Sequence, residues 1–273
     1  MIYKRIDLPT LSGESVPMDM YLPAVSGEID PSPSRRSIVI CPGGGYEFLS
    51  EREAEPIALR FAGMGFNCFV VWYRVAPHRY PLPQQDVACA VAYVRRHAAE
   101  LHSHPDRIAV MGFSAGGHVA GSLGVWWPKA ELWQPLSPED VRPNAMVLCY
   151  PVISGGPRAH RGSFVNLSGT EDVSAHAAFS LDEQVTGQTP PAFLWHTWDD
   201  SCVPVENTLL MASALRRCGV AAEVHIFPHG SHGLALADET TTRPDLPDML
   251  LPDCAQWPVL AARFLTGVLA SGL

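Results

Sequence analysis

The chain has 273 residues, of which 47% are hydrophobic and 17% are charged, so it can form a large core and is not a disordered chain. Its 19 Lys and Arg against 28 Asp and Glu give a formal net charge of −9 at pH 7. This balance argues against nucleic acid or a membrane as a partner, because nucleic acids and anionic membranes are bound by basic patches.

The cysteines and the first residues indicate the compartment. There are seven cysteines, an odd number with no CxxC pair, and most of them lie in apolar segments, which favours free thiols. The first 14 residues contain no apolar segment typical of a signal peptide. We therefore expect a cytoplasmic protein without disulfides.

Short apolar segments typical of strands alternate with helical patterns along the chain, which predicts an α/β fold with a mostly parallel central sheet and helices on both faces. An N-terminal hairpin is expected from residues 2–8 and 17–22. Further strands are expected at residues 37–41, 67–73, 107–113, 145–151, 192–197 and 222–227. Helices are expected at residues 52–65, 84–101, 115–125, 205–218 and 254–269.

No change in composition divides the chain, so we predict a single domain over residues 1–273 with a minimal cap. Two stretches, 126–141 and 155–188, are expected to be insertions over one end of the sheet. The sequence of residues 234–252 predicts a loop and leaves open whether this loop forms a lid. Residues 108–127 lack charged side chains, but their five glycines favour a buried strand, turn and helix over a membrane span.

Residues 112–116 read Gly-Phe-Ser-Ala-Gly, a G-x-S-x-G pattern between a predicted strand and a predicted helix. In this context the pattern is typical of a nucleophile elbow, where glycines permit a sharp turn that exposes the serine. The alternative is a glycine-rich turn that binds a phosphate. We predict that Ser114 is a catalytic nucleophile.

Residues 41–46, Cys-Pro-Gly-Gly-Gly-Tyr, follow another predicted strand and occupy the place of the HGGG-type oxyanion loop, with Pro42 where that motif has histidine. The backbone N–H groups of Gly44 and Gly45, together with that of Ala115, are the expected oxyanion donors. The alternative is an ordinary glycine-rich loop. Tyr46 and Glu47 lie beside this loop and are predicted to contact the alcohol part of a substrate, or else to face solvent.

Asp200 follows the strand at residues 192–197, four positions before a proline, and is the expected acid that orients a histidine; its rival is Asp199. The expected base is His232, in a glycine-flanked loop after the strand at residues 222–227, and its rival is His229. Because the carboxyl ends of parallel strands meet at one edge of a sheet, we expect these side chains to share one crevice.

The remaining histidines give no sign of a metal site. The sequence has no HExxH motif and no paired CxxC, so we expect no metal and no cofactor. His118 follows the predicted elbow and is expected to pack or to form a supporting hydrogen bond.

These motifs resemble the α/β-hydrolase superfamily over nearly the whole chain, and within it the small acetyl esterases and acetyl xylan esterases, including bifunctional feruloyl/acetyl xylan esterases. The resemblance lies in residues 20–23 (MYLP), 41–46 (CPGGGY), 112–118 (GFSAGGH), 189–197 (TPPAFLWHT), 203–207 (VPVEN) and 230–233 (GSHG). It implies a cytoplasmic serine esterase that uses Ser114, Asp200 and His232.

The substrate expected from this resemblance is a small short-chain ester, with acetyl on a sugar or oligosaccharide as the leading form. Three alternatives keep the same fold: an amide-cleaving enzyme such as an arylformamidase or peptidase, an acyltransferase, and a binding module without catalysis. Whether the chain forms a homo-oligomer is open.

Overall fold

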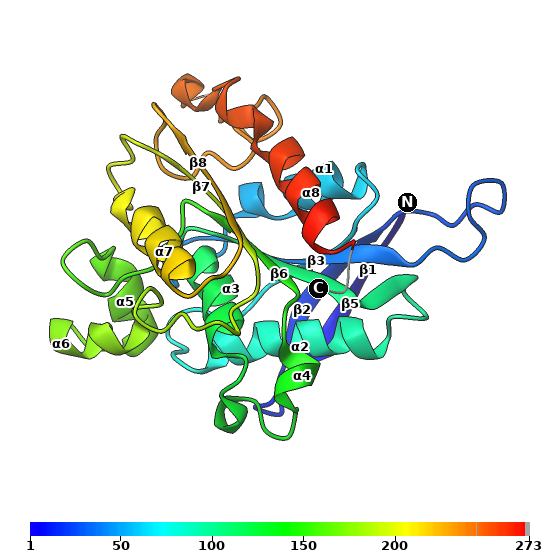
Figure 1. The fold of residues 1–273 in the computed structure, drawn as a ribbon, viewed down its shortest axis with the longest axis horizontal. Coiled ribbons are helices and arrows are strands. Elements are labelled where there is room, and N and C mark those ends of the chain that lie inside the picture. Colours follow the sequence, from blue (N-terminus) through cyan, green and yellow to red (C-terminus); the bar gives the residue numbers. More distant parts are fainter. Residues whose placement is uncertain (244, 271–273) are drawn as a thin grey trace.

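The computed structural model describes residues 1–243 and 245–270, which form a twisted, mostly parallel sheet with helices on both faces (Figure 1). In this part of the chain the sheet has eight strands in the order β1-β2-β4-β3-β5-β6-β7-β8. β1 pairs with β2 and β2 with β4 in antiparallel fashion, and the other neighbours are parallel. The strands are β1 (Ile2–Pro9), β2 (Ser15–Leu22), β3 (Arg35–Cys41), β4 (Asn67–Val71), β5 (Ser103–Phe113), β6 (Ala145–Cys149), β7 (Ala192–Thr197) and β8 (Ala222–Phe227).

Two hydrophobic clusters lie on opposite faces of the sheet. One face is covered by α2 and α3, and the opposite face by α1 and α8 (Figure 1). Side chains of β5 alternate between them: Val110 belongs to the first cluster and Met111 to the second, as the pleat of a strand requires. The helices are α1 (Glu55–Ala62), α2 (Leu82–Arg96), α3 (Ala115–Trp126), α4 (Pro138–Val141), α5 (Arg161–Ser168), α6 (Val173–His176), α7 (Glu206–Arg217) and α8 (Trp257–Val268).

The predicted fold class is confirmed, and most elements lie where the periodicity places them. The strands at β7 and β8 have the predicted bounds. The helix predicted at residues 52–65 is instead a short 3₁₀ turn, Glu51–Glu53, followed by α1, because Pro56 near the start of α1 favours a new first turn there. The helix predicted at 84–101 begins earlier and ends earlier, as α2.

The two expected insertions are ordered segments. Residues 126–141 contain α4 and bury the three tryptophans Trp126, Trp127 and Trp133. Residues 155–188 contain α5 and α6, and Asn166 of α5 donates a hydrogen bond of 2.9 Å to the carbonyl oxygen of Gly45. This second segment therefore packs against the predicted oxyanion loop.

The segment expected to be a loop at residues 234–252 begins inside the core. The side chains of Leu234 to Ala237 are buried, and Trp257 of α8 donates a hydrogen bond of 2.8 Å to the carbonyl oxygen of Ala235. Residues 108–127 form the end of β5, a turn and α3, as expected. Within the described ranges, no helix is long and apolar enough to cross a membrane.

Candidate active site

Ser114 occupies a strained turn between β5 and α3. Its backbone angles are φ 53° and ψ −119°, a conformation that few residues other than glycine adopt. The turn also requires Gly112 and Gly116, because an added Cβ would lie 2.1 Å from the carbonyl oxygen of Gly116 in the first case and 2.2 Å from that of Cys41 in the second. The glycines of the G-x-S-x-G pattern are thus needed for close backbone packing.

The structure brings Ser114, His232 and Asp200 into one hydrogen-bonded chain. His232 Nε2 lies 2.7 Å from Ser114 Oγ, and His232 Nδ1 lies 2.7 Å from Asp200 Oδ2. The three side chains follow β5, β7 and β8, whose carboxyl ends lie at the same edge of the sheet. This arrangement has the geometry of a nucleophile, a base and an orienting acid.

The rival residues form a separate pair at the surface. His229 Nδ1 lies 3.0 Å from Asp199 Oδ2, and the side chain of His229 is 80% exposed. Asp199 also accepts a hydrogen bond of 2.8 Å from the backbone N–H of Gly230, so it shapes the loop that carries His232. Neither rival contacts Ser114.

Asp200 is held as a carboxylate by several donors. Its Oδ1 accepts hydrogen bonds of 2.9 Å from the backbone N–H groups of Cys202 and Val203. Its Oδ2 is contacted by His232 and by His196 Nε2, the latter at 3.2 Å. Burial acts to raise the pKa of Asp200, but the hydrogen bonds from His196 and His232 outweigh it and hold the pKa well below its usual value.

The glycine loop after β3 faces Ser114. Gly44 and Gly45 have φ values of 133° and 66°, which favour glycine, and both line the same cavity as Ser114. Their backbone N–H groups and that of Ala115 have no hydrogen-bond partner among residues 1–243 and 245–270. These three groups are therefore available to a developing oxyanion.

The structure does not bring Tyr46 to the cavity, contrary to the expectation from sequence. Its side chain is only 1% exposed, and its hydroxyl lies 2.7 Å from His118 Nδ1 and 3.2 Å from Gln84 Nε2. The reason is local: with φ at 59°, Tyr46 turns its ring into the core below the loop. Its neighbour Glu47 is exposed and lines the cavity, so its contact with substrate stays a prediction.

The cavity around Ser114 has a volume of about 560 Å³. His160 also lines this cavity, although no sequence pattern singles out this residue. Its Nδ1 lies 2.8 Å from Ser163 Oγ, and burial followed by the nearby His232 lowers the pKa of His160. Neutral His160 thus adds a polar ring to the cavity wall without adding charge.

Glu53 is a second residue that sequence patterns missed. Its carboxylate is buried, with the residue 3% exposed, and Oε2 accepts a hydrogen bond of 2.7 Å from the backbone N–H of Gly43. Oε1 accepts one of 2.7 Å from the hydroxyl of Tyr150, whose ring centroid is 5.1 Å from that of His232. Glu53 therefore connects the predicted oxyanion loop, through Gly43, to Tyr150, whose ring packs beside His232.

We expect Glu53→Gln to lower kcat about 10-fold with little change in KM, on the scale of a lost positioning interaction. Both partners of Glu53 donate to it, because the Tyr150 hydroxyl already accepts a hydrogen bond from the N–H of Ala235. A Gln amide has only one acceptor oxygen, so one of the two bonds is lost and the loop shifts. Steady-state kinetics on a short ester measures this change.

The pH dependence of the melting temperature distinguishes this positioning role of Glu53 from a role in supporting the fold alone. Burial raises the pKa of Glu53, although the bonds from Tyr150 and Gly43 oppose part of the rise. An acid whose folded pKa is raised loses stability as pH rises from its unfolded pKa toward its folded one. The Tm of Glu53→Gln should therefore gain on that of the wild type as pH rises above about 4.3, the usual Glu pKa. If kcat of Glu53→Gln were lowered only in proportion to a lowered Tm at every pH, the positioning role would be contradicted.

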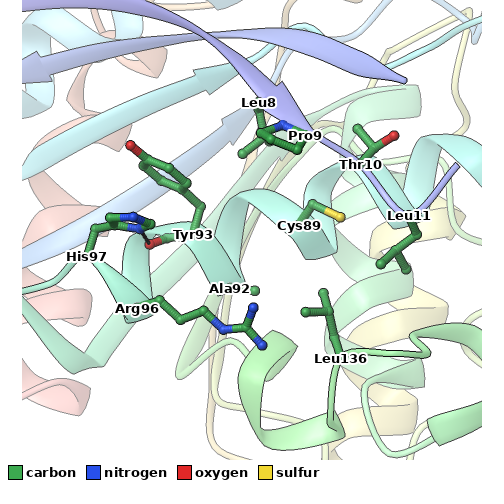
Figure 2. Close-up of a pocket in the computed structure, with 10 residues that line it drawn as sticks. All are labelled: Leu8, Pro9, Thr10, Leu11, Cys89, Ala92, Tyr93, Arg96, His97 and Leu136. Atoms are coloured by element: carbon green, nitrogen blue, oxygen red, sulfur yellow. Dashed lines mark hydrogen bonds between the residues drawn. The ribbon is translucent and has the colours of Figure 1, made fainter. Parts of the chain in front are cut away.

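A second hollow lies away from Ser114, Asp200 and His232. It has a volume of about 210 Å³ and lies between the turn after β1 and the helix α2, where Tyr93 stacks on His97 (Figure 2). Figure 2 shows mostly apolar side chains around this hollow.

In the part of the chain that the structure describes, no group of three or more His, Cys, Asp or Glu is placed to hold a metal ion.

Residues 18–215 match the model of the BD-FAE family. The chain belongs to the BD-FAE family. Among solved structures, this BD-FAE chain is similar to an acetyl ester-xyloside bifunctional hydrolase from Caldicellulosiruptor lactoaceticus, with 36% identity, a TM-score of 0.83 and 97% and 96% of the two chains covered. It is also similar to the carboxylesterase Cest-2923 from Lactobacillus plantarum, with 29% identity, a TM-score of 0.86 and both chains covered in full. The resemblance expected from the motifs is confirmed.

Two sequence relatives are larger proteins. The chain is 37% identical over 213 residues to endo-1,4-beta-xylanase B of Butyrivibrio fibrisolvens, which covers 75% of the chain and 33% of that protein. It is 34% identical over 233 residues to an acetylxylan esterase of Xylanibacter ruminicola, which covers 83% of the chain and 46% of that protein. The chain thus spans between a third and a half of the length of these two relatives.

Proposed function

We propose that this BD-FAE protein is a serine carboxylesterase that removes short acyl groups, acetyl in particular, from sugars. The observation that carries the proposal is the hydrogen-bonded chain from Ser114 Oγ through His232 to Asp200, with both contacts at 2.7 Å. Such an arrangement activates a hydroxyl for attack on an acyl carbon.

The reaction follows from this geometry in two halves. His232 Nε2 takes the hydroxyl proton of Ser114 as Oγ attacks the ester carbonyl carbon, and the resulting oxyanion accepts hydrogen bonds from the N–H groups of Gly44, Gly45 and Ala115. The C–O bond to the alcohol then breaks, and His232 gives its proton to the leaving alcohol. Water attacks the acyl-enzyme with His232 again as base, which releases the acid and restores Ser114.

Two kinds of observation support an acetylated sugar as the substrate. The names of one relative and one structural neighbour refer to acetylxylan and to an acetyl ester-xyloside. Glu47 on the exposed rim of the cavity offers an acceptor for the hydroxyls of the alcohol part.

The proposed reaction needs no cofactor. The seven cysteines are all free, which suits a location in a reducing cytoplasm.

The direct test is hydrolysis of p-nitrophenyl esters from acetate to octanoate, followed by acetylated xylose and xylo-oligosaccharides. We expect kcat/KM to be highest for acetate and to fall as the acyl chain lengthens. A maximum at longer chains would keep the mechanism and overturn the acetyl assignment. Hydrolysis of matched anilides but not of esters would overturn the esterase in favour of an amide-cleaving enzyme.

A further inference from the structure

A second cleft, which we call the hairpin cleft, adjoins the catalytic cavity. It has a volume of about 370 Å³ and lies between the N-terminal hairpin, the end of β4 and the start of α1. Its walls include Tyr3, Arg5, Asp19, Tyr21, Glu55 and Trp72. Glu51 lines both this cleft and the cavity around Ser114, so the two hollows meet at Glu51.

The aromatic walls of the hairpin cleft are fixed by one buried carboxylate. Asp19 accepts hydrogen bonds from the Tyr3 hydroxyl at 2.8 Å and from Trp72 Nε1 at 2.7 Å. The Arg5 guanidinium donates two more, both at 2.6 Å. The Tyr21 ring packs on the Tyr3 ring at a centroid distance of 5.2 Å. These rings are held in place before any ligand arrives, which lowers the entropic cost of binding.

Acceptors remain unused beside these rings. The side chain of Glu51 forms no hydrogen bond or ion pair with any residue that the structure describes, and Glu55 uses only Oε2, which accepts from the Tyr21 hydroxyl at 2.9 Å. Tyr3 is 53% exposed, so its ring can be reached from solvent. The cleft therefore offers an aromatic surface next to free carboxylate oxygens.

This chemistry selects the kind of ligand. Arg5 balances Asp19, while Glu51 and Glu55 leave the cleft negative, which disfavours an anionic ligand. Aromatic rings bind apolar faces, and carboxylate oxygens accept hydrogen bonds from hydroxyl groups. A neutral ligand with many hydroxyls and apolar C–H faces, such as a sugar unit, fits both requirements.

We propose that the hairpin cleft binds sugar units of an oligosaccharide whose acetyl ester lies at Ser114. The chain of sugars would pass Glu51 and reach the ring of Tyr3 beside α1. This inference rests on the proposed function and adds to it: the preferred substrate is an acetylated oligosaccharide and not an acetylated monosaccharide.

The test uses the ratio of kcat/KM for an acetylated xylotetraose to that for an acetylated xylose. We expect this ratio to exceed 1 in the wild type and to fall about 3- to 10-fold in Tyr3→Ala, the range expected for loss of one aromatic contact. Tyr3→Phe keeps the ring and loses only the hydroxyl bond to Asp19, so it should restore most of the ratio. Melting temperatures of both variants show whether the fold is retained.

Tyr93→Ala is the matched control, because Tyr93 lines the hollow of Figure 2 on the α2 face of the sheet, opposite to α1. It should leave the ratio unchanged. A ratio that does not change in Tyr3→Ala, or that falls equally in Tyr93→Ala, would overturn the hairpin cleft as a sugar site. Absence of activity on both sugars in the wild type, with activity on p-nitrophenyl acetate, would instead overturn the proposed sugar substrate.

Discussion

Ser114→Ala is expected to lower kcat for p-nitrophenyl acetate by at least about 10³-fold, because no other hydroxyl contacts His232 Nε2 in the described part of the chain. The substitution removes one oxygen atom and keeps the Cβ, so the strained turn at φ 53° is tolerated as it is with serine. The oxyanion donors remain, which leaves a small residual rate above that in water. Steady-state kinetics over a range of enzyme concentrations measures the loss.

Two controls make this expectation decisive. The Tm of Ser114→Ala should stay close to that of the wild type, since the Ser114 side chain has one hydrogen bond to the described residues, to His232, and Asp200 also holds His232. A fluorophosphonate should label the wild type at Ser114 and leave the variant unlabelled by mass spectrometry. Wild-type turnover in the variant, or a label on another residue, would remove Ser114 as the proposed nucleophile.

The sequence predicted well those features that depend on short, local patterns. The elbow requires Gly112 and Gly116 for steric reasons, so its pattern appears in five consecutive residues. Strand β7 follows Pro190 and Pro191, and strand β8 lies between Gly219 and Pro228, so residues typical of turns made the bounds of both strands predictable. The order Ser114, Asp200, His232 then placed all three residues at one edge of a parallel sheet.

Two features that depend on contacts between distant segments have no local sequence pattern and could not be predicted. Glu53 lies in a segment with a helical pattern, where glutamate usually faces solvent, and its partner Tyr150 is 97 positions away. The outward or inward direction of Tyr46 depends on one backbone angle and on His118, 72 positions away. No local pattern carries this information, because each position is set by packing across the sheet.

Asp200→Asn is expected to lower kcat by about 10⁴-fold, the loss known for an amide in place of a triad acid. The structure gives the reason. The backbone N–H groups of Cys202 and Val203 both point at Oδ1, so an Asn must place its carbonyl oxygen there. Its NH₂ group then faces His232 Nδ1 and donates to it, which leaves the proton on Nε2. A His232 of that tautomer cannot accept the proton of Ser114.

Asp199→Asn is the matched control for this substitution, because Asp199 is the neighbouring aspartate and the rival triad acid. It pairs with the exposed His229, and its Oδ1 accepts from the backbone N–H of Gly230, a bond that an Asn carbonyl oxygen preserves. An exposed contact of this kind contributes little, so we expect less than about a 3-fold change in kcat. Comparable losses in the two variants, or a larger loss in Asp199→Asn, would contradict the assignment of Asp200. Because the Asn at 200 keeps the backbone hydrogen bonds and nearly the same volume, a large loss there with an unchanged Tm would place its effect on the proton at His232 and not on the fold.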